Sequence, residues 1–320
     1  MTMLLTRTEI EPLLHLPSLL PPLRAAFASY SLERSVPALR VRSSLPGQET
    51  ASAMLIFPGL VPTIPAYTVK VHAKYPGLQP ALKGVLLLHD LENGSLLAIM
   101  DSTAITAVRT GLAGALAADV LARPGAESAA IIGAGVQGRL QLRCLTLVRS
   151  LKRAWVYDTI KRNTESFAAD MEVELGIPVM IASSPEEAAR EADIVVTSTW
   201  ASQPFLFAGM VQPGTHITTL GPDEPGKVEV AADLLRSGLF VCDDRELALT
   251  MGAVGNVGLG RESIHAELGE IIAGQRVGRS SPEQITIFGG VGLAFQDLVA
   301  CWHVYQAAQQ HTHLSLDFLS

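Results

Sequence analysis

From about residue 112 onward, the spacing of apolar residues switches repeatedly between a helical and a strand period. The predicted helices are GLAGALAADVLA, QGRLQLRCLTLVRS, NTESFAADMEVEL and SPEEAAREA. The predicted strands are SAAIIG, RAWVYD, IPVMIA, DIVVTST and THITTLG. Strands separated by helices of this length favour right-handed βαβ units on a parallel sheet, so this part of the chain is predicted to be a Rossmann-type domain.

The first hundred residues follow a different pattern, in which proline and glycine separate extended apolar runs such as SAMLIFPG and AYTVKVHAKYPG. The Asn-Gly pair in LENGSL is typical of a tight hairpin, so we expect a mostly antiparallel sheet. The C-terminal helix FQDLVACWHVYQAAQQ could return to pack on this sheet. The predicted fold class is therefore α/β, with a Rossmann-type domain at 113–299 and a smaller α+β domain at 1–112 completed by 300–320.

Composition narrows the range of partners. The chain has 320 residues, enough for two domains, and its 24 Lys and Arg against 31 Asp and Glu give a formal net charge of −7. Without a basic block, nucleic acid is not an expected partner. Its three cysteines lack metal-ligand spacing, which indicates a reducing compartment and no metal site. Apolar runs shorter than a bilayer requires, and no leader pattern, predict a cytoplasmic protein without a membrane partner.

The segment IIGAGVQG carries a complete G-x-G-x-x-G pattern between a predicted strand and a predicted helix. Such glycines allow a tight turn and a close approach of the backbone to a pyrophosphate, which the free N–H groups of the helix then bind. The predicted cofactor-binding residues are Gly133, Gly135, Val136, Gln137 and Gly138. The alternative is a purely structural glycine-rich turn.

Asp158 ends the next predicted strand, 20 residues beyond Gly138, where an acid should hydrogen-bond the adenine ribose. A carboxylate there repels a 2′-phosphate, which favours NAD(H). Lys161 and Arg162 follow closely and leave NADP(H) as the alternative.

Several segments together resemble the ornithine cyclodeaminase/mu-crystallin family. They are GSLLAIMDSTAITAVRTGLAGALAA, GAGVQG, GPDEPGKVEV and IFGGVGLAFQD, in the expected order along nearly the whole chain. The resemblance implies a homodimer with a subunit contact through the N-terminal domain, and a nicotinamide cofactor on the Rossmann domain. It also implies an active site between the domains that acts on an amino acid or a cyclic imino acid.

By this resemblance, Arg40, Lys70 and Arg109 hold the substrate carboxylate, a task that suits cations able to fix its orientation. Arg42 is an alternative to Arg40, because residues two apart in a strand point to the same face. Surface salt bridges are the alternative explanation for these three cations.

Asp223 in GPDEPG follows a predicted strand at the carboxyl end of the sheet, where ligands collect in open α/β folds. The resemblance makes it the proton-transfer group near the substrate nitrogen, and Lys70 its catalytic companion. Turn chemistry before Glu-Pro-Gly is the alternative explanation.

Further residues are expected to line the cofactor: Thr197, Ser198, Thr199 and Val291. Threonines are also frequent in strands for reasons of propensity alone. We expect Asp297 to cap or brace the last helix. His72 shares a strand face with Lys70 but is left outside the predicted site.

The expected reaction is the reduction of a cyclic imine-2-carboxylate such as Δ1-pyrroline-2-carboxylate to L-proline. In ornithine-specific members of the family a glutamate precedes the lysine strand, whereas Leu55 or a neighbour stands there in SAMLIFPG, which weakens ornithine as a substrate. The alternatives are ornithine cyclodeaminase, then an alanine-type dehydrogenase, then a non-catalytic binding protein similar to mu-crystallin.

Overall fold

The computed structural model describes residues 1–33, 39–43, 53–75 and 78–318. The chain forms two compact units: unit 1 is Met1–Arg109 with Leu293–Ser320, and unit 2 is Thr110–Gly292. The predicted boundary at 299 would cut the continuous helix α11 (Ala294–Ala308). The change of unit instead comes just before that helix, after Gly292, whose φ of 92° belongs to the left-handed region.

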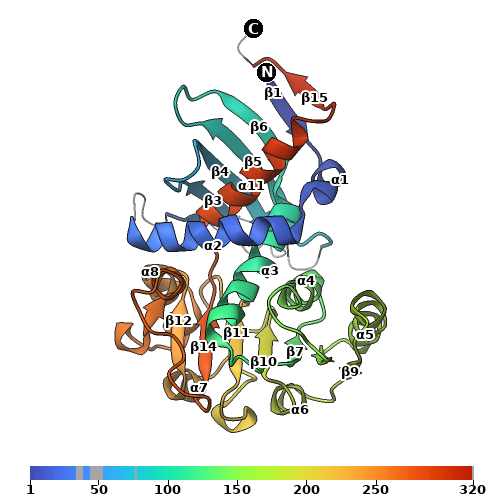
Figure 1. Ribbon diagram of the computed structural model, residues 1–320, viewed down its shortest axis with the longest axis vertical. Coiled ribbons are helices and arrows are strands. Elements are labelled where there is room, and N and C mark those ends of the chain that lie inside the picture. The colour runs from blue at the N-terminus through green and yellow to red at the C-terminus, as the bar shows by residue number, and fades with distance from the viewer. Residues whose placement is uncertain (34–38, 44–52, 76–77, 319–320) are drawn as a thin grey trace. The chain divides into compact units, whose positions relative to one another are not determined.

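Over its described residues, unit 2 contains an eight-stranded sheet in which every strand pair is parallel (Figure 1). The spatial order is β13-β12-β14-β11-β10-β7-β8-β9. Strand succession reverses between β7 and β10, which is the topological switch point of a Rossmann sheet and confirms the predicted fold class. The bounds are β7 Ser128–Ile132, β8 Arg153–Tyr157, β9 Val179–Ile181, β10 Ile194–Thr197, β11 His216–Thr219, β12 Leu239–Cys242, β13 Ala266–Glu267 and β14 Thr286–Gly289.

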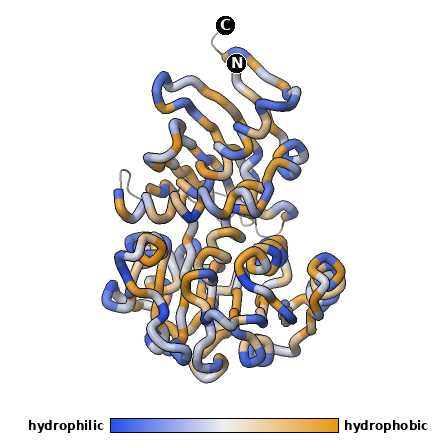
Figure 2. The backbone as a smooth tube through the Cα atoms, in the orientation of Figure 1, coloured by the Kyte–Doolittle hydropathy of each residue, from blue (hydrophilic) through white to orange (hydrophobic). Residues whose placement is uncertain are grey.

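Both faces of this sheet are covered. In β7, Ala130 and Ile132 join one apolar cluster while Ala129 and Ile131 join another, because successive side chains of a strand point to opposite faces. Figure 2 shows mainly hydrophobic residues along these strands and hydrophilic ones in the loops. The helices of unit 2 are α4 Val136–Leu145, α5 Lys161–Leu175, α6 Pro185–Arg190, α7 Ala232–Ser237, α8 Arg245–Thr250, α9 Ala253–Asn256 and α10 Leu268–Ile272, with 3-10 turns η2 Ala208–Met210 and η3 Arg261–Ser263.

The sequence analysis expected no apolar segment long enough to cross a bilayer, and helix α3 (Ser102–Leu121) corrects this expectation. It is long and apolar enough, by length and composition, to cross a membrane, although Arg109 and Asp119 interrupt its apolar runs. However, 78% of its most apolar window is buried inside the protein, which is typical of a core helix.

Within its described ranges, unit 1 contains a seven-stranded sheet of order β15-β1-β6-β5-β4-β3-β2. It is mostly antiparallel, as predicted, and only the β1–β6 pair is parallel. The predicted Asn-Gly hairpin joins β5 to β6, with Gly94 at a φ of 75°. The strands are β1 Thr2–Leu5, β2 Val41–Ser43, β3 Ala53–Gly59, β4 Ala66–Lys74, β5 Leu82–Asp90, β6 Leu96–Asp101 and β15 Leu314–Leu316, with helices α1 Arg7–Ile10, α2 Leu16–Leu32 and α11, and a 3-10 turn η1 Glu11–Leu13.

The two faces of the unit 1 sheet differ. Helix α11 contacts β3, β4 and α2, so the C-terminal helix packs on the sheet as expected. Along β4 the burial alternates strictly, and one face carries Thr68, Lys70, His72 and Lys74, all buried. The opposite face, with Val69 and Val71, is only half-buried. A strand that buries a row of polar side chains needs a chemical reason, since charged groups are rarely buried unless they are paired.

Candidate functional site

The glycine loop, residues 133–138, connects β7 to α4 at the switch point of the unit 2 sheet. Gly133 has a φ of 108°, and a Cβ there would lie 2.6 Å from the carbonyl oxygen of Ser198. A Cβ on Gly138 would overlap the carbonyl oxygen of Gly133, so this glycine allows the helix to pack on the strand. Among the described residues nothing lies within 4 Å of a Cβ on Gly135, which leaves open space beside the backbone.

The N-terminus of α4 faces that open space. Gly135 is the N-cap residue and Val136 is 67% exposed, so the first N–H groups of the helix are accessible to an anion. Within the described ranges, the buried side-chain Nε2 of Gln137 has no hydrogen-bond partner. The open cradle and the helix N-terminus fit a dinucleotide pyrophosphate.

Asp158 lies directly beside the glycine loop. Its Oδ2 accepts a hydrogen bond from the N–H of Ala134 at 2.9 Å, and its Oδ1 accepts from the N–H of Ile160 at 2.9 Å. These two donors fix the carboxylate next to the cradle, in the place where a ribose hydroxyl would be recognised. Lys161 is largely exposed and pairs with Glu165 at 3.6 Å.

The end of β10 depends on a glutamate that the sequence analysis missed. Glu229 is fully buried, and its carboxylate accepts hydrogen bonds of 2.6 to 3.0 Å from the hydroxyls of Thr197, Thr199 and Thr219 and from the N–H groups of Thr199 and Gly221. The hydroxyls of Thr197 and Thr199 therefore shape the loops after β10 and β11. In the described chain, the buried Ser198 hydroxyl has no partner.

The segment after β14 is anchored by a second buried acid. Asp243, at the end of β12, accepts from the N–H of Gly292 at 2.6 Å and from the backbone of Val291, the predicted cofactor residue. Burial, aided by Asp244, raises the pKa of Asp243 to about 6, although these backbone donors oppose the rise.

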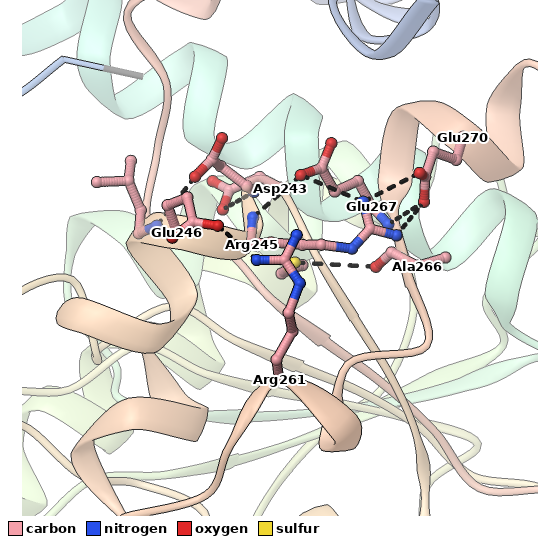
Figure 3. A network of polar contacts seen from close by, with 10 residues as sticks. Asp243, Arg245, Glu246, Arg261, Ala266, Glu267 and Glu270 are labelled. Atoms are coloured by element: carbon pink, nitrogen blue, oxygen red, sulfur yellow. Dashed lines mark hydrogen bonds and ion pairs between the residues drawn. The ribbon is translucent and has the colours of Figure 1, made fainter. Parts of the chain in front are cut away.

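Figure 3 shows the surrounding polar network. Arg245 donates to Glu270 at 3.0 Å and pairs with Glu267 at 3.4 Å, while Arg261 pairs with Glu246. The Arg245 contacts link α8 to the start of α10, and the Arg261 pair links α8 to η3, so the network stabilises the segment that follows Asp243 at the end of β12.

Asp223 lies in the loop after β11, with its side chain 26% exposed. Its Oδ1 accepts from Nζ of Lys227 at 2.9 Å, and Lys227 also pairs with Glu224 at 3.0 Å and lies 4.0 Å from the ring centroid of Trp200. Burial opposes the charge of Lys227, but Asp223 and Glu224 outweigh it and raise its pKa. Lys227, which the sequence analysis missed, thus keeps a positive charge against the Asp223 carboxylate.

In unit 1, two of the predicted cations converge on one carboxylate. Nζ of Lys70 lies 3.1 and 3.2 Å from the two oxygens of Asp297, and Nε of Arg109 lies 3.1 Å from Oδ1. Arg109 also donates to Oε1 of Gln296 at 2.8 Å. The structure corrects the expected role of Asp297: Leu293 is the N-cap of α11, and Asp297 is the counter-ion of the two cations.

Arg40 completes the group, which we call the cation cluster: Arg40, Lys70 and Arg109. Its guanidinium carbon lies 4.5 Å from the ring centroid of Phe57, and Nζ of Lys70 lies 5.6 Å from the same centroid. The alternative residue, Arg42, is exposed. Phe57, another residue missed from the sequence, lies opposite Lys70 on β3.

The electrostatics of the cluster suit an anionic ligand. Burial lowers the pKa of Lys70 to about 8, aided by Arg109 and opposed by Asp297. Burial also disfavours ionised Asp297, but Arg109 and Lys70 outweigh it, so its pKa lies below the usual range. Lys70 and Arg109 share the Asp297 carboxylate, and cations held in this way are suited to bind a substrate carboxylate. Over the described ranges, no group of three or more His, Cys, Asp or Glu could hold a metal ion.

The chain is similar along most of its length to known proteins. The model of the ornithine cyclodeaminase/mu-crystallin family matches residues 1–312. Ketimine reductase mu-crystallin of Mus musculus is 35% identical over 309 residues, which cover 95% of this chain and 96% of that protein. Δ1-pyrroline-2-carboxylate reductase of Thermococcus litoralis, solved with NADH and L-proline, is 33% identical with a TM-score of 0.92, covering 98% of this chain and all of that one. An archaeal alanine dehydrogenase dimer with bound NAD is 32% identical with a TM-score of 0.93 and 99% coverage of both chains.

Proposed function

This chain belongs to the ornithine cyclodeaminase/mu-crystallin family, and we propose that it is a nicotinamide-dependent reductase of cyclic imine-2-carboxylates such as Δ1-pyrroline-2-carboxylate. The product would be L-proline or a homologue. The observation that carries this proposal is the pairing of buried Lys70 and Arg109 with Asp297, in the same chain as a complete dinucleotide loop. The similar enzyme of Thermococcus litoralis was solved with NADH and L-proline.

On this proposal, unit 2 holds the cofactor, preferably NAD(H), with NADP(H) as the alternative. The glycine loop, with Val136 and Gln137, would bind the pyrophosphate, and Asp158 would bind the ribose. Thr197, Ser198 and Thr199 at the end of β10, and Val291 after β14, would line the remaining length. When bound, the cofactor supplies a hydride to the carbon of the C=N bond.

The other groups act on the substrate. Arg40, Lys70 and Arg109 would hold its carboxylate, which fixes the imine carbon for reaction. Asp223 would manage the proton on the nitrogen, since Lys227 beside it favours a carboxylate that can hold an iminium. The balance is one imine, one reduced cofactor and one proton, giving one cyclic amine and one oxidised cofactor.

The second candidate is an amino acid dehydrogenase of the alanine type, because the archaeal alanine dehydrogenase shares the fold along 99% of both chains. Ornithine cyclodeamination is less favoured. Leu55 is buried at 1% exposure beside Phe57, and this apolar surface offers nothing to a second amine.

We also propose a cytoplasmic homodimer that forms through unit 1. The half-buried face of its sheet carries Val69, Val71 and the 41% exposed Val85, an apolar surface that a second copy would cover. Val71→Asp should halve the mass measured by light scattering. Val173→Asp, at an 87% exposed position on α5, should leave the mass unchanged. A monomeric parent protein would contradict this part of the proposal.

The first experiment compares initial rates of NADH and NADPH oxidation with Δ1-pyrroline-2-carboxylate, beside proline formation from L-ornithine with catalytic NAD+. Imine-dependent oxidation without ornithine turnover is the expected result. Asp223→Ala should remove turnover and keep cofactor affinity. A parent protein that turns over neither imines nor amino acids would instead be a binding protein.

A further inference from the structure

We infer that His72 is a specificity-determining residue that selects substrates carrying a hydroxyl group beyond the carboxylate. This inference deepens the proposed function of the same site and rests on it. It starts from a residue that the sequence analysis left outside the site.

His72 lies on the same buried face of β4 as Lys70, two residues further along the strand. Across the sheet it lies opposite Leu55 of β3, and its ring lies 5.3 Å from that of Phe57 in an edge-on arrangement. Phe57 is the ring that also lies beside Arg40 and Lys70. The imidazole therefore borders the cation cluster through a shared aromatic neighbour.

The backbone fixes the position of this imidazole. On the other side of β4, His72 lies opposite Gly84 of β5. A Cβ on Gly84 would come within 2.5 Å of the His72 Cβ, so the two strands fit together only with glycine there. The ring is thus confined between Gly84, Leu55 and Phe57, none of which offers a polar side chain.

The polar atoms of the ring need a partner. His72 is 6% exposed, and over the described ranges neither Nδ1 nor Nε2 has a hydrogen-bond partner. Leaving two buried polar atoms unsatisfied is costly, so a buried histidine of this kind indicates a ligand group that meets it.

The charge state of the ring defines that group. Burial and then the neighbouring Lys70 lower the pKa of His72 to about 2, so the imidazole is neutral, with one donor and one acceptor nitrogen. A hydroxyl is also both a donor and an acceptor, so it can form a hydrogen bond with either nitrogen. A carboxylate could use only the donor. An ammonium group would meet the positive charges of Lys70, Lys74 and Arg40, which together with burial outweigh the Asp297 carboxylate and oppose protonation of His72.

The test uses stable substrates in the oxidative direction. NAD+ reduction is measured with L-proline and with cis- and trans-4-hydroxy-L-proline, and with L-aspartate and L-ornithine as representatives of the other two groups. The variants are His72→Leu, which removes both polar atoms, and His72→Gln, which keeps a donor and an acceptor. Thr68→Val is the matched control. Thr68 is also buried on this face, and over the described ranges its hydroxyl has no hydrogen-bond partner. It lies beside Gly59 and Ala294 instead of Leu55 and Phe57.

We expect the parent protein to have a higher kcat/KM for one hydroxyproline isomer than for proline. His72→Leu should lower that value roughly 3- to 10-fold, the effect of one hydrogen bond, and leave proline within twofold. His72→Gln should recover most of the preference, and Thr68→Val should not alter the ratio. Melting temperatures identify a variant that has failed to fold.

Equal loss for proline and hydroxyproline in both His72 variants would overturn the inference, as would a preference for aspartate or ornithine that depends on His72. If the parent protein oxidises none of these compounds and also fails to oxidise NADH with Δ1-pyrroline-2-carboxylate, the proposed function fails. Thermal shifts with proline and hydroxyproline, measured on the parent and on His72→Leu, would then decide the role of His72 separately.

Discussion

The glycine loop of unit 2 and the cation cluster of unit 1 are built in opposite ways. The loop places its three glycines within six consecutive residues, where local backbone contacts require Gly133 and Gly138 while Gly135 borders open space. In the cluster, Lys70 and Asp297 are 227 residues apart, and Arg109 and Asp297 are 188 apart. A single substitution in a site made of local backbone should therefore change the stability of the fold little. In a site made of buried charges, the loss of one partner should change it strongly.

Removing the shared carboxylate should produce the largest effect. Asp297→Asn leaves the buried charges of Lys70 and Arg109 without their counter-ion, so we expect the free energy of unfolding to fall by about 3–5 kcal/mol. Urea denaturation followed by circular dichroism measures this loss. Asp170→Asn, which breaks an exposed pair with Arg139, should cost less than about 1 kcal/mol. Similar losses of stability in Asp297→Asn and Asp170→Asn would show that the buried carboxylate is no more important to the fold than an exposed ion pair.

Two alanine substitutions in the glycine loop separate its folding role from its binding role. Gly138→Ala forces a Cβ against Gly133 and should lower the free energy of unfolding by about 1–3 kcal/mol. Gly135→Ala places a Cβ in open space, so stability should stay within about 0.5 kcal/mol of the parent. NADH affinity, measured by fluorescence titration, should nevertheless fall roughly tenfold. Normal NADH binding by Gly135→Ala would show that the open space beside Gly135 does not bind the cofactor.

The pH dependence of kcat/KM tests the charge of the cluster. Because the pKa of Lys70 is lowered to about 8, its positive charge is lost above pH 8, and kcat/KM for the imine should then fall up to roughly tenfold per pH unit. Lys70→Arg should remove this decline between pH 8 and 9.5. A decline that persists in Lys70→Arg would assign the titration to another group.

The same shift has a defined sign for stability. A lysine with a lowered pKa binds fewer protons in the folded state, so its contribution to the free energy of unfolding rises between about pH 8 and the unfolded pKa of roughly 10.4. Below pH 8 the full penalty of the buried charge is present. Chemical denaturation at pH 7.5 and 9.5 measures the difference, with Lys70→Arg as the control.

The smallest expected effect concerns the choice of cofactor. Asp158→Ser removes the charge that repels a 2′-phosphate and should shift the NADPH to NADH ratio of kcat/KM roughly fivefold toward NADPH, or about 1 kcal/mol. The same variant loses carboxylate acceptors for Ala134 and Ile160, so its melting temperature is measured in parallel. An unchanged ratio would mean that another residue excludes NADPH.

The parts of the molecule that could be predicted from sequence are the local ones. The Rossmann sheet and its glycine loop follow from short-range periodicity and from a motif. The partners of the predicted side chains could not be read in this way. Asp297 looked like a helix-capping residue, because nothing in its own segment indicates two cations on another part of the chain. Glu229 and Phe57 gave no signal at all, since their roles depend on strand pairing and on loops that meet only in the folded protein.

The bond between Lys70 and Asp297 also determines the order in which the protein can be completed during synthesis. Ribosomes add about 5–20 residues per second, so roughly 10 to 45 seconds separate the appearance of Lys70 from that of Asp297. All of unit 2 is made within this interval, and it is contiguous in sequence. Unit 1, which contains the N-terminal residues, is therefore completed last. Until Asp297 is synthesised, Lys70 and Arg109 have no counter-ion from α11.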